Sequence, residues 1–170
     1  SNGTATITVK GSSDRSYTIA YTIYPDGVVD MKVNFDSGYS TTYRVGLAMQ
    51  FGSGFEGVEY YGRGPWANYP DRKTGSYLGR YATCVNDLFE EYTHPQTNGD
   101  HLNLRDLTLT APNVALKIET EGDVSFSMSH YQESYWSAKT WRTKKHNDEM
   151  TRQGNIYAHF DAAISGVGNG

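Results

Sequence analysis

Apolar and polar residues alternate with a period of two over most of this 170-residue chain. One alternating run precedes the turn sequence Pro25-Asp26-Gly27, and a second, from Val29 to Phe35, follows it. Because successive side chains of a strand point to opposite faces of a sheet, this pattern predicts a hairpin over residues 17–35 with one buried face. Similar runs recur at residues 7–9, 43–51, 114–118, 124–128 and 156–160. Gly, Asn, Asp or Pro separates the runs, and this spacing favours an all-β, antiparallel β-sandwich over alternating strands and helices.

Two segments depart from the alternation. The apolar phase slips by one residue between Leu104 and Leu107, which predicts a β-bulge near Arg105-Asp106. Residues 134–150 gather aromatic side chains ahead of a polar stretch. That stretch is compatible with a helix, and equally with a structured loop that contains a short helical turn.

The segment Tyr-Tyr-Gly-Arg-Gly-Pro-Trp-Ala-Asn-Tyr-Pro-Asp-Arg, residues 60–72, combines four aromatic rings with two glycines and two prolines. Regular helix or strand could hardly accommodate this composition, so we expect a shaped loop. Gly62 and Gly64 permit positive φ, and the prolines fix φ. Asn68 tolerates a left-handed turn. Ordered loops often carry function, which makes this segment the first candidate for a binding site.

Length and charge exclude several classes of function. A chain of 170 residues suits a single domain, residues 1–170, and is too short for a complete β/α barrel with anything else attached. The formal net charge of −4 offers no broad positive field, so we expect no nucleic-acid partner. No apolar stretch approaches the ~20 residues that cross a bilayer, so we expect no membrane partner either.

Catalytic side chains are hard to find in the sequence. Glycosidic cleavage needs two carboxylates that converge on one bond, whereas the neighbouring Glu90 and Glu91 would point to opposite faces of a strand. The five histidines show no paired spacing that would aim two rings at one metal ion, so we expect no metal site. A sugar epimerase would need two histidines and a carboxylate from different strands, and His101 with His130 remains open on spacing alone.

Aromatic side chains are the stronger lead, because the chain has 14 tyrosines and three tryptophans. Rings with polar tips suit sugar recognition, since the apolar face of a pyranose stacks on them. Strands of a sandwich also favour tyrosine for plain packing. We therefore expect Tyr60, Tyr61 and Tyr77 to be core or strand-face residues. Trp66 and Tyr69 are expected to face another domain or a ligand.

Residues 62–72 resemble the Gly-x-Gly-Pro-x-x-Asn-Tyr-Pro-Asp-Arg segment in the C-terminal domain of large bacterial β-galactosidases, the lacZ-like enzymes of glycoside hydrolase family 2. Residues 92–99, followed by Arg105-Asp106-Leu107, are similar to a second segment of that domain, in the same order. The hairpin over residues 17–35 and the strand over residues 126–131 also resemble it. The likeness covers nearly the whole chain.

The resemblance implies a galactose-mutarotase-like supersandwich beside a (β/α)₈ barrel that carries both catalytic glutamates of a retaining mechanism. It implies magnesium and sodium sites in other domains, so we expect no cofactor here. In the family a tryptophan follows a segment similar to residues 166–170, and this chain ends before it. We therefore expect an incomplete sandwich with strands missing at both ends. The parent protein would be cytoplasmic or periplasmic in a bacterium.

The function expected from the resemblance is that of an accessory, non-catalytic domain of a β-galactosidase that hydrolyses terminal β-D-galactosides. Its partners would be the remaining domains and possible galactosides. Alternatives are a carbohydrate-binding module that stacks sugars on Trp66, Tyr69 and Trp136, and an assembly domain whose unpaired strand edges self-associate. Asp71 and Arg72 are expected to form an ion pair that braces the loop. The residues expected to contact carbohydrate or another domain are Trp66, Asn68, Tyr69, Asp71 and Arg72.

Overall fold

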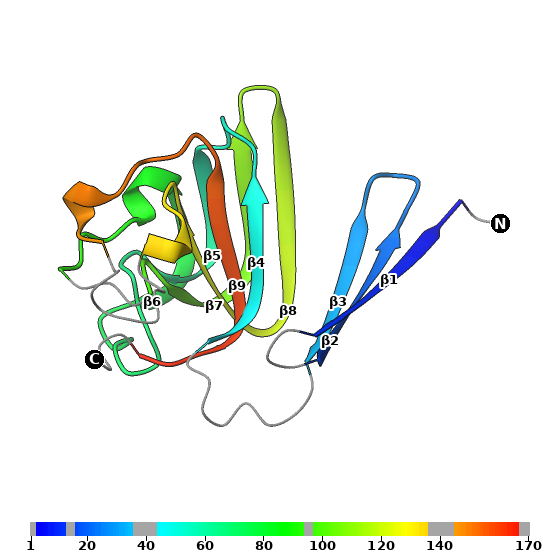
Figure 1. The fold of residues 1–170 in the computed structure, drawn as a ribbon, viewed down its shortest axis with the longest axis horizontal. Coiled ribbons are helices and arrows are strands. Elements are labelled where there is room, and N and C mark those ends of the chain that lie inside the picture. The colour runs from blue at the N-terminus through cyan, green and yellow to red at the C-terminus, as the bar shows by residue number, and fades with distance from the viewer. Residues whose placement is uncertain (1–2, 13–15, 36–43, 94–96, 136–144, 167–170) are drawn as a thin grey trace. The chain divides into compact units, whose positions relative to one another are not determined.

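The computed structural model of the chain describes residues 3–12, 16–35, 44–93, 97–135 and 145–166, which belong to two compact units, residues 1–41 and 42–170. The N-terminal unit is a three-stranded antiparallel sheet in the order β1-β2-β3 (Figure 1). Its strands are β1 (Ala5–Ser12), β2 (Ser16–Ile23) and β3 (Val29–Phe35). The predicted hairpin over residues 17–35 is confirmed.

The turn between β2 and β3 follows from its sequence. Gly27 has a φ of 90°, which its lack of a side chain permits, and the Asp26 carboxylate accepts a hydrogen bond from the Val28 backbone at 3.1 Å. The resulting register places Ile7 beside Tyr21 and Tyr21 beside Met31. All apolar side chains of the alternating runs therefore share one face of this sheet.

The larger unit contains a six-stranded antiparallel sheet in the order β4-β9-β8-β7-β5-β6. Its strands are β4 (Arg44–Phe51), β5 (Gly57–Gly64), β6 (Tyr77–Cys84), β7 (His101–Ala111), β8 (Val114–Ser129) and β9 (Ile156–Ile164). With two antiparallel sheets, the chain is all-β as predicted, consistent with a β-sandwich. The prediction that residues 1–170 act as a single domain remains a prediction.

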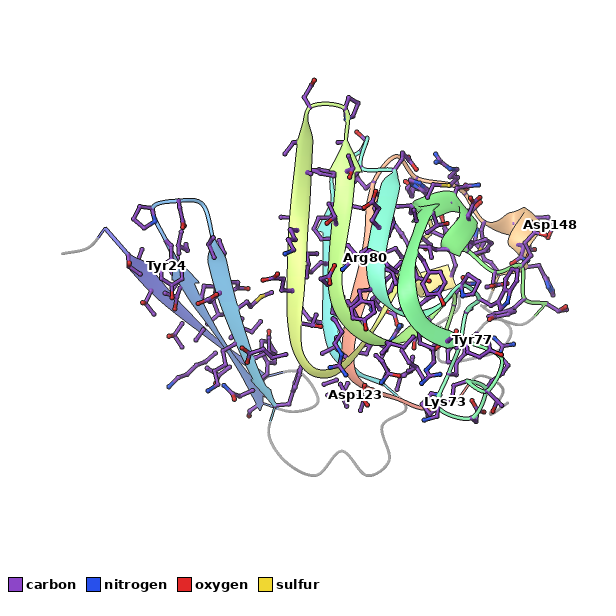
Figure 2. All side chains as sticks on the ribbon, turned by 180° about the vertical axis from the view of Figure 1, so that it is seen from behind. Tyr24, Lys73, Tyr77, Arg80, Asp123 and Asp148 are labelled. Carbon is purple, nitrogen blue, oxygen red and sulfur yellow. The ribbon has the colours of Figure 1, made fainter. Side chains whose placement is uncertain are left out.

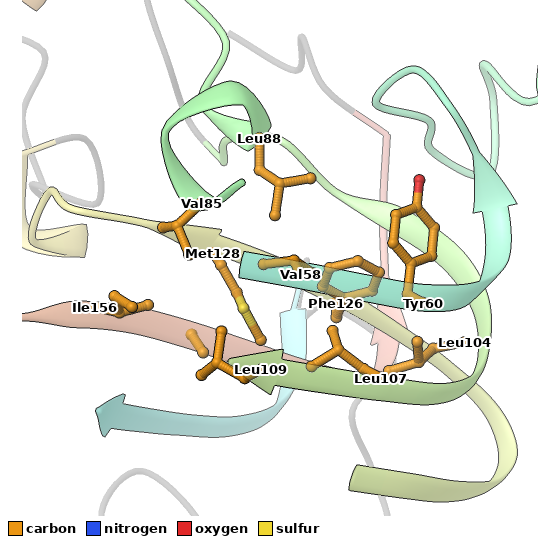
Figure 3. Packing of buried hydrophobic residues seen from close by; sticks show 11 residues of the cluster. Val58, Tyr60, Val85, Leu88, Leu104, Leu107, Leu109, Phe126, Met128 and Ile156 are labelled. Carbon is orange, nitrogen blue, oxygen red and sulfur yellow. The ribbon is translucent and has the colours of Figure 1, made fainter. Parts of the chain in front are cut away.

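One face of the six-stranded sheet carries the main hydrophobic core (Figure 3). The 3₁₀ helix η1 (Val85–Leu88) packs Val85 and Leu88 into this core. The buried residues of the cluster are Val58, Tyr60, Val85, Leu88, Leu104, Leu107, Leu109, Phe126, Met128, Ile156 and Ala158. This face positions the end of β5, from which the candidate loop departs.

The long strands β7 and β8 confirm one prediction and correct another. The register of β7 against β8 shifts on both sides of Leu104, which confirms the bulge near Arg105-Asp106. The runs 114–118 and 124–128 were expected to be separate strands around a turn, and this is wrong. They form the single strand β8, because Gly122, with a φ of 84°, lets the chain bend without ending the strand.

Helical structure is short in the described residues. Residues 134–150, which are compatible with a helix or with a loop that contains a short helical turn, lie partly outside the described residues. The described ends of this segment form the 3₁₀ turns η2 (Glu133–Tyr135) and η4 (Asn147–Glu149). Within the described part of the chain, no helix is long and apolar enough to cross a membrane.

Candidate contact loop and buried polar layer

The expected loop over residues 60–72 is wrong in its first part. Residues 60–64 belong to strand β5, and the loop, called the contact loop below, spans residues 65–76 between β5 and β6. Gly62 and Gly64 do not use positive φ. A Cβ on Gly64 would instead collide with the Tyr60 hydroxyl and come within 3.0 Å of the Tyr81 ring. Close packing, rather than turn geometry, therefore explains this glycine.

Asn68 fixes the contact loop from inside. Its side chain is fully buried, and its amide nitrogen donates to the carbonyl oxygens of Arg63 at 3.0 Å and Trp66 at 2.9 Å. The Leu102 backbone N–H donates to its side-chain oxygen at 3.0 Å. The Asn68 backbone N–H donates to the carbonyl of Asp100 at 2.7 Å. One side chain thus joins the loop to the end of β5 and the start of β7.

Tyr69 anchors the second half of the contact loop and is also fully buried. Its hydroxyl accepts hydrogen bonds from the Thr97 hydroxyl at 3.3 Å and from the Asp100 backbone N–H at 3.4 Å. Burial is the main reason that the pKa of Tyr69 is raised. A ring enclosed in this way braces the loop, so Tyr69 presents no stacking face to a sugar in this structure.

Arg72 and Asp71 do not form the expected ion pair, which is absent from the described residues. Arg72 donates to the Tyr92 hydroxyl at 2.9 Å, and its guanidinium lies 5.5 Å from the centre of the Tyr69 ring. The Asp71 carboxylate lies against Gly166, where any side chain would collide with it. The backbones of Tyr69 and Arg72 pair with each other across a tight turn that contains Asp71.

Trp66 is the most exposed large aromatic ring of the contact loop, with 70% of its surface accessible. Tyr77, where β6 begins beyond the loop, is equally exposed (Figure 2). Tyr60 lies in the core, whereas Tyr61 is 36% exposed on the other face of β5, so all three tyrosines occupy core or strand-face positions. Nothing in the described residues tests the predicted contact of Trp66, Asn68, Tyr69, Asp71 and Arg72 with carbohydrate or another domain. Of these five, Trp66, Asp71 and Arg72 are exposed.

A layer of mostly buried polar side chains lies on β4, β8 and β9. It also includes Asp100, which precedes β7, and the partly buried Glu133 on η2. We call it the polar layer. Arg44 donates from Nε to Asp161 at 2.8 Å and from Nη1 to Glu133 at 3.3 Å, and the Ser125 hydroxyl donates to Asp100 at 3.1 Å. Its members are Arg44, Asp100, Ser125, Ser127, Glu133, His159 and Asp161.

Burial shifts the titration of this layer. It raises the pKa of Asp161 to about 6, although Arg44 opposes the shift. The Arg44–Asp161 pair therefore stays ionised at neutral pH. Burial and the nearby Arg44 lower the pKa of His159 to about 4, so its imidazole is neutral beside Glu133 at pH 7. Burial, followed by the charge of Asp161, raises the pKa of Asp100 well above its ordinary range.

The two histidines left open for epimerase chemistry have different partners. The His101 ring contacts the carbonyls of Gly99 and Pro65, whereas the His130 ring contacts the carbonyl of Asn155 and the Glu56 carboxylate. No group of three His, Cys, Asp or Glu side chains in the described segments is arranged to hold a metal ion.

Most of the polar layer was not identified from the sequence. Ser125, Ser127 and Ser129 alternate with Phe126 and Met128, a pattern that normally marks a solvent-facing side of a strand. In the structure all three serines are buried. The available signal was Arg44, the second residue of the alternating run 43–51, because a charged residue in an apolar strand needs a partner when the strand is covered.

Each of the two compact units is built on one antiparallel sheet, and the larger sheet carries a hydrophobic core on one face, so the chain is of the all-β class. The chain belongs to the β-galactosidase small chain family, whose match covers residues 1–170. It is 31% identical over 150 residues to a β-galactosidase of Vibrio cholerae and 26% identical over 154 residues to one of Staphylococcus xylosus. A third, from Streptococcus thermophilus, is 29% identical over 160 residues.

These matches cover most of this chain and a small part of each relative. They include 87%, 89% and 93% of the chain in the Vibrio, Staphylococcus and Streptococcus comparisons, but only 14%, 15% and 15% of the relatives. The chain therefore corresponds to one small part of much larger proteins.

Proposed function

We propose that this chain is an accessory, non-catalytic domain of a β-galactosidase, and that the parent protein hydrolyses terminal β-D-galactosides. The observation that carries the proposal is the family match over residues 1–170, together with relatives that are all named β-galactosidases. The small share of each relative that the chain covers supports an accessory rather than a complete catalytic unit.

The carboxylates of the polar layer support placing the chemistry outside this chain. A glycosidase needs an acid and a nucleophile or base that both reach the scissile bond. Asp100 and Asp161 are buried to 0% and 2% exposure, and Asp161 is bound to Arg44. Side chains in this state serve packing and charge balance, and a galactoside has no access to them.

The contact loop supports an interdomain role. Asn68 and Tyr69 hold the loop through buried hydrogen bonds, while Trp66 projects a large ring that is 70% exposed. An indole fixed in solvent adds nothing to the stability of its own domain, but it suits a docking anchor, since tryptophan is enriched in the energetic centres of interfaces. We therefore propose that Trp66 contacts the remaining domains of the parent protein.

The test is Trp66→Ala in the natural protein that contains this chain, with Tyr77→Ala as the matched control. Both residues are 70% exposed, but only Trp66 lies on the contact loop. We expect Trp66→Ala to lower the temperature at which β-galactosidase activity is lost by several degrees, and Tyr77→Ala to change it little. Equal effects of the two substitutions, or no effect of either, would contradict an interdomain role for Trp66.

A carbohydrate-binding module is the second candidate, favoured only by the exposed Trp66 ring. Tyr69 is buried, and Trp136 lies outside the described residues. Titration with galactose, lactose and longer galactans, followed by tryptophan fluorescence, separates the two functions. Saturable binding that Trp66→Ala abolishes would favour the module, whereas no saturation would favour the interdomain contact.

Self-association through strand edges is a further possibility that the topology supports. Strands β4 and β6 end the larger sheet, and β1 and β3 end the smaller one. An unpaired edge presents free backbone groups to another chain. We expect light scattering of the isolated chain to show association that increases with concentration, and a monomer at every concentration would count against it.

A further inference from the structure

Asp100 combines complete burial with incomplete hydrogen bonding. It sits just before β7 with 0% exposure. Its Oδ1 accepts a hydrogen bond from Ser125, whereas its Oδ2 is buried and has no hydrogen-bond partner among the described residues. An ionised carboxylate usually accepts several hydrogen bonds, and burying one of its oxygens without any partner is unfavourable. A neutral carboxylic acid fits this geometry better, because a hydroxyl at Oδ1 has the Ser125 oxygen as acceptor at 3.1 Å and only an uncharged carbonyl oxygen then lacks a partner.

The charges around Asp100 point the same way. Arg44 is the cation of the polar layer, but its Nε is bound to Asp161 at 2.8 Å and its Nη1 to Glu133 at 3.3 Å. Asp161, on β9, adds a second negative charge near Asp100. One guanidinium thus lies near three carboxyl groups. It stabilises the negative charge of Asp161 most, because the contact with Asp161 is the shortest.

The other groups near Asp100 supply no compensating positive charge. His159, on β9, lies 3.6 Å from Glu133, and burial lowers its pKa to about 4. Burial also lowers the pKa of His101, on β7, which keeps that ring neutral. The Tyr69 hydroxyl, on the contact loop, accepts a hydrogen bond from the Asp100 backbone N–H, and burial raises its pKa, so it is neutral. An ionised Asp100 would therefore be a buried charge with no cation of its own.

The backbone of Asp100 is a main support of the contact loop. Its carbonyl accepts the Asn68 N–H at 2.7 Å, and its N–H donates to the Tyr69 hydroxyl at 3.4 Å. The position of Asp100 therefore determines the position of both residues that hold the loop. The side chain of Asp100 is fixed to β8 through Ser125, so a change of charge at its carboxyl group reaches the loop directly.

We propose that Asp100 carries a bound proton in the folded chain at neutral pH, and that this proton keeps the contact loop attached to the sheet. Asp161 also has a buried oxygen, Oδ1, without a partner among the described residues, but it remains ionised under the same conditions because its Oδ2 accepts a hydrogen bond from Arg44 Nε at 2.8 Å. Opening the loop would expose Asp100 to water, where the carboxyl group releases its proton. Opening therefore becomes easier as the pH rises, until the pH exceeds the pKa that Asp100 has in the closed state.

The test is hydrogen exchange in the natural protein that contains this chain, between about pH 7 and about pH 9, a range in which an ordinary aspartate no longer titrates. The amides followed are those of Asn68 and Leu102, which bond to the Asp100 carbonyl and to the Asn68 side chain. We expect their protection factors to fall by up to about tenfold per pH unit in the wild type. The amides of β2, in the other compact unit, control for general effects of pH.

Asp100→Asn and Asp161→Asn form a matched pair of variants. Asparagine imitates a protonated aspartate, so Asp100→Asn should fold and should show protection at Asn68 and Leu102 that does not change with pH. Asp161→Asn removes the closest anion of Arg44 and should destabilise the unit far more. Protection that is constant with pH in the wild type, or that falls equally in Asp100→Asn, would overturn the proposal.

If Asp100→Asn does not fold, a second measurement tests whether Asp100 is protonated in the wild type. Carbon-13 NMR of aspartate carboxyl groups in the wild-type protein should show one resonance that titrates above neutral pH. Asp161, with a pKa of about 6, accounts for any titration near that pH. If no aspartate carboxyl group titrates above about pH 7, Asp100 carries no proton at neutral pH and the proposal fails.

Discussion

Replacing Asn68 by alanine removes the side chain that fixes the contact loop. Three hydrogen bonds disappear, to the carbonyls of Arg63 and Trp66 and from the N–H of Leu102. The site is fully buried, so the freed groups cannot all turn to water. Each buried group without a partner costs roughly 1–3 kcal/mol, and partial relaxation of the loop recovers some of it. We therefore expect a loss of about 4 kcal/mol in the free energy of unfolding.

Urea unfolding measures this loss directly. With a slope of about 2 kcal/mol per molar urea, the unfolding midpoint should fall by about 2 M while the slope stays unchanged. Asn86→Ala is the matched control, because Asn86 is exposed on η1 and should change stability by less than about 0.5 kcal/mol. If Asn68→Ala shifts the unfolding midpoint no more than Asn86→Ala does, the hydrogen bonds of the Asn68 side chain do not hold the contact loop in place.

Three further predictions concern the buried surroundings of the loop. Gly64→Ala should lower the free energy of unfolding by about 1–3 kcal/mol, because its Cβ meets the Tyr60 hydroxyl, and adding Tyr60→Phe should restore part of the loss. Tyr60→Phe alone should stabilise the chain by about 1 kcal/mol in urea unfolding, because that buried hydroxyl has no partner among the described residues. The free energy of unfolding of His159→Gln should rise by roughly 2–3 kcal/mol relative to that of the wild type as the pH falls from about 7 to about 4, because the folded wild type resists protonation of His159. The same pH dependence of unfolding in the variant and the wild type would contradict this.

The pKa of Asp161 is raised and that of His159 is lowered. A substitution at one of the two residues is therefore needed to measure the effect of the other on the pH dependence of stability. Asp161 has a raised pKa, so its contribution to stability is complete below its ordinary pKa and is lost as the pH rises through about 6. His159 has a lowered pKa, so its contribution is complete above its ordinary pKa and is lost as the pH falls toward about 4. Between about pH 4 and about pH 6, the two groups change the stability of the wild type in opposite directions as the pH changes, so their effects largely cancel.

Local patterns in the sequence predicted the strands well where one face of a sheet is apolar. The hairpin over residues 17–35 and the bulge near Leu104 follow from side-chain alternation alone. The end of β5 could not be predicted from the sequence, because Gly62 and Gly64 suggest a turn when they are considered without their neighbours. Their use becomes visible only when the Tyr60 and Tyr81 rings are seen packing against the strand.

The site was predictable in its location but not in its chemistry. The composition of residues 60–72 pointed to an ordered loop, and the exposed Trp66 lies there. The polar layer joins side chains that are far apart in the chain, such as Arg44 and Asp161. Such contacts depend on the strand order β4-β9-β8, which local sequence does not specify. The same limit explains why the predicted Asp71–Arg72 ion pair was wrong, since two neighbours in sequence need not bind each other.

We propose that this chain supports the β-galactosidase activity of its parent protein without performing the hydrolysis itself. The most direct test is an assay of the purified 170-residue chain against a chromogenic β-galactoside, beside the natural protein that contains it. We predict that the natural protein releases the chromophore and that the chain alone does not, even at high concentration and long incubation. Turnover of the chromogenic β-galactoside by the purified chain alone would contradict this proposal.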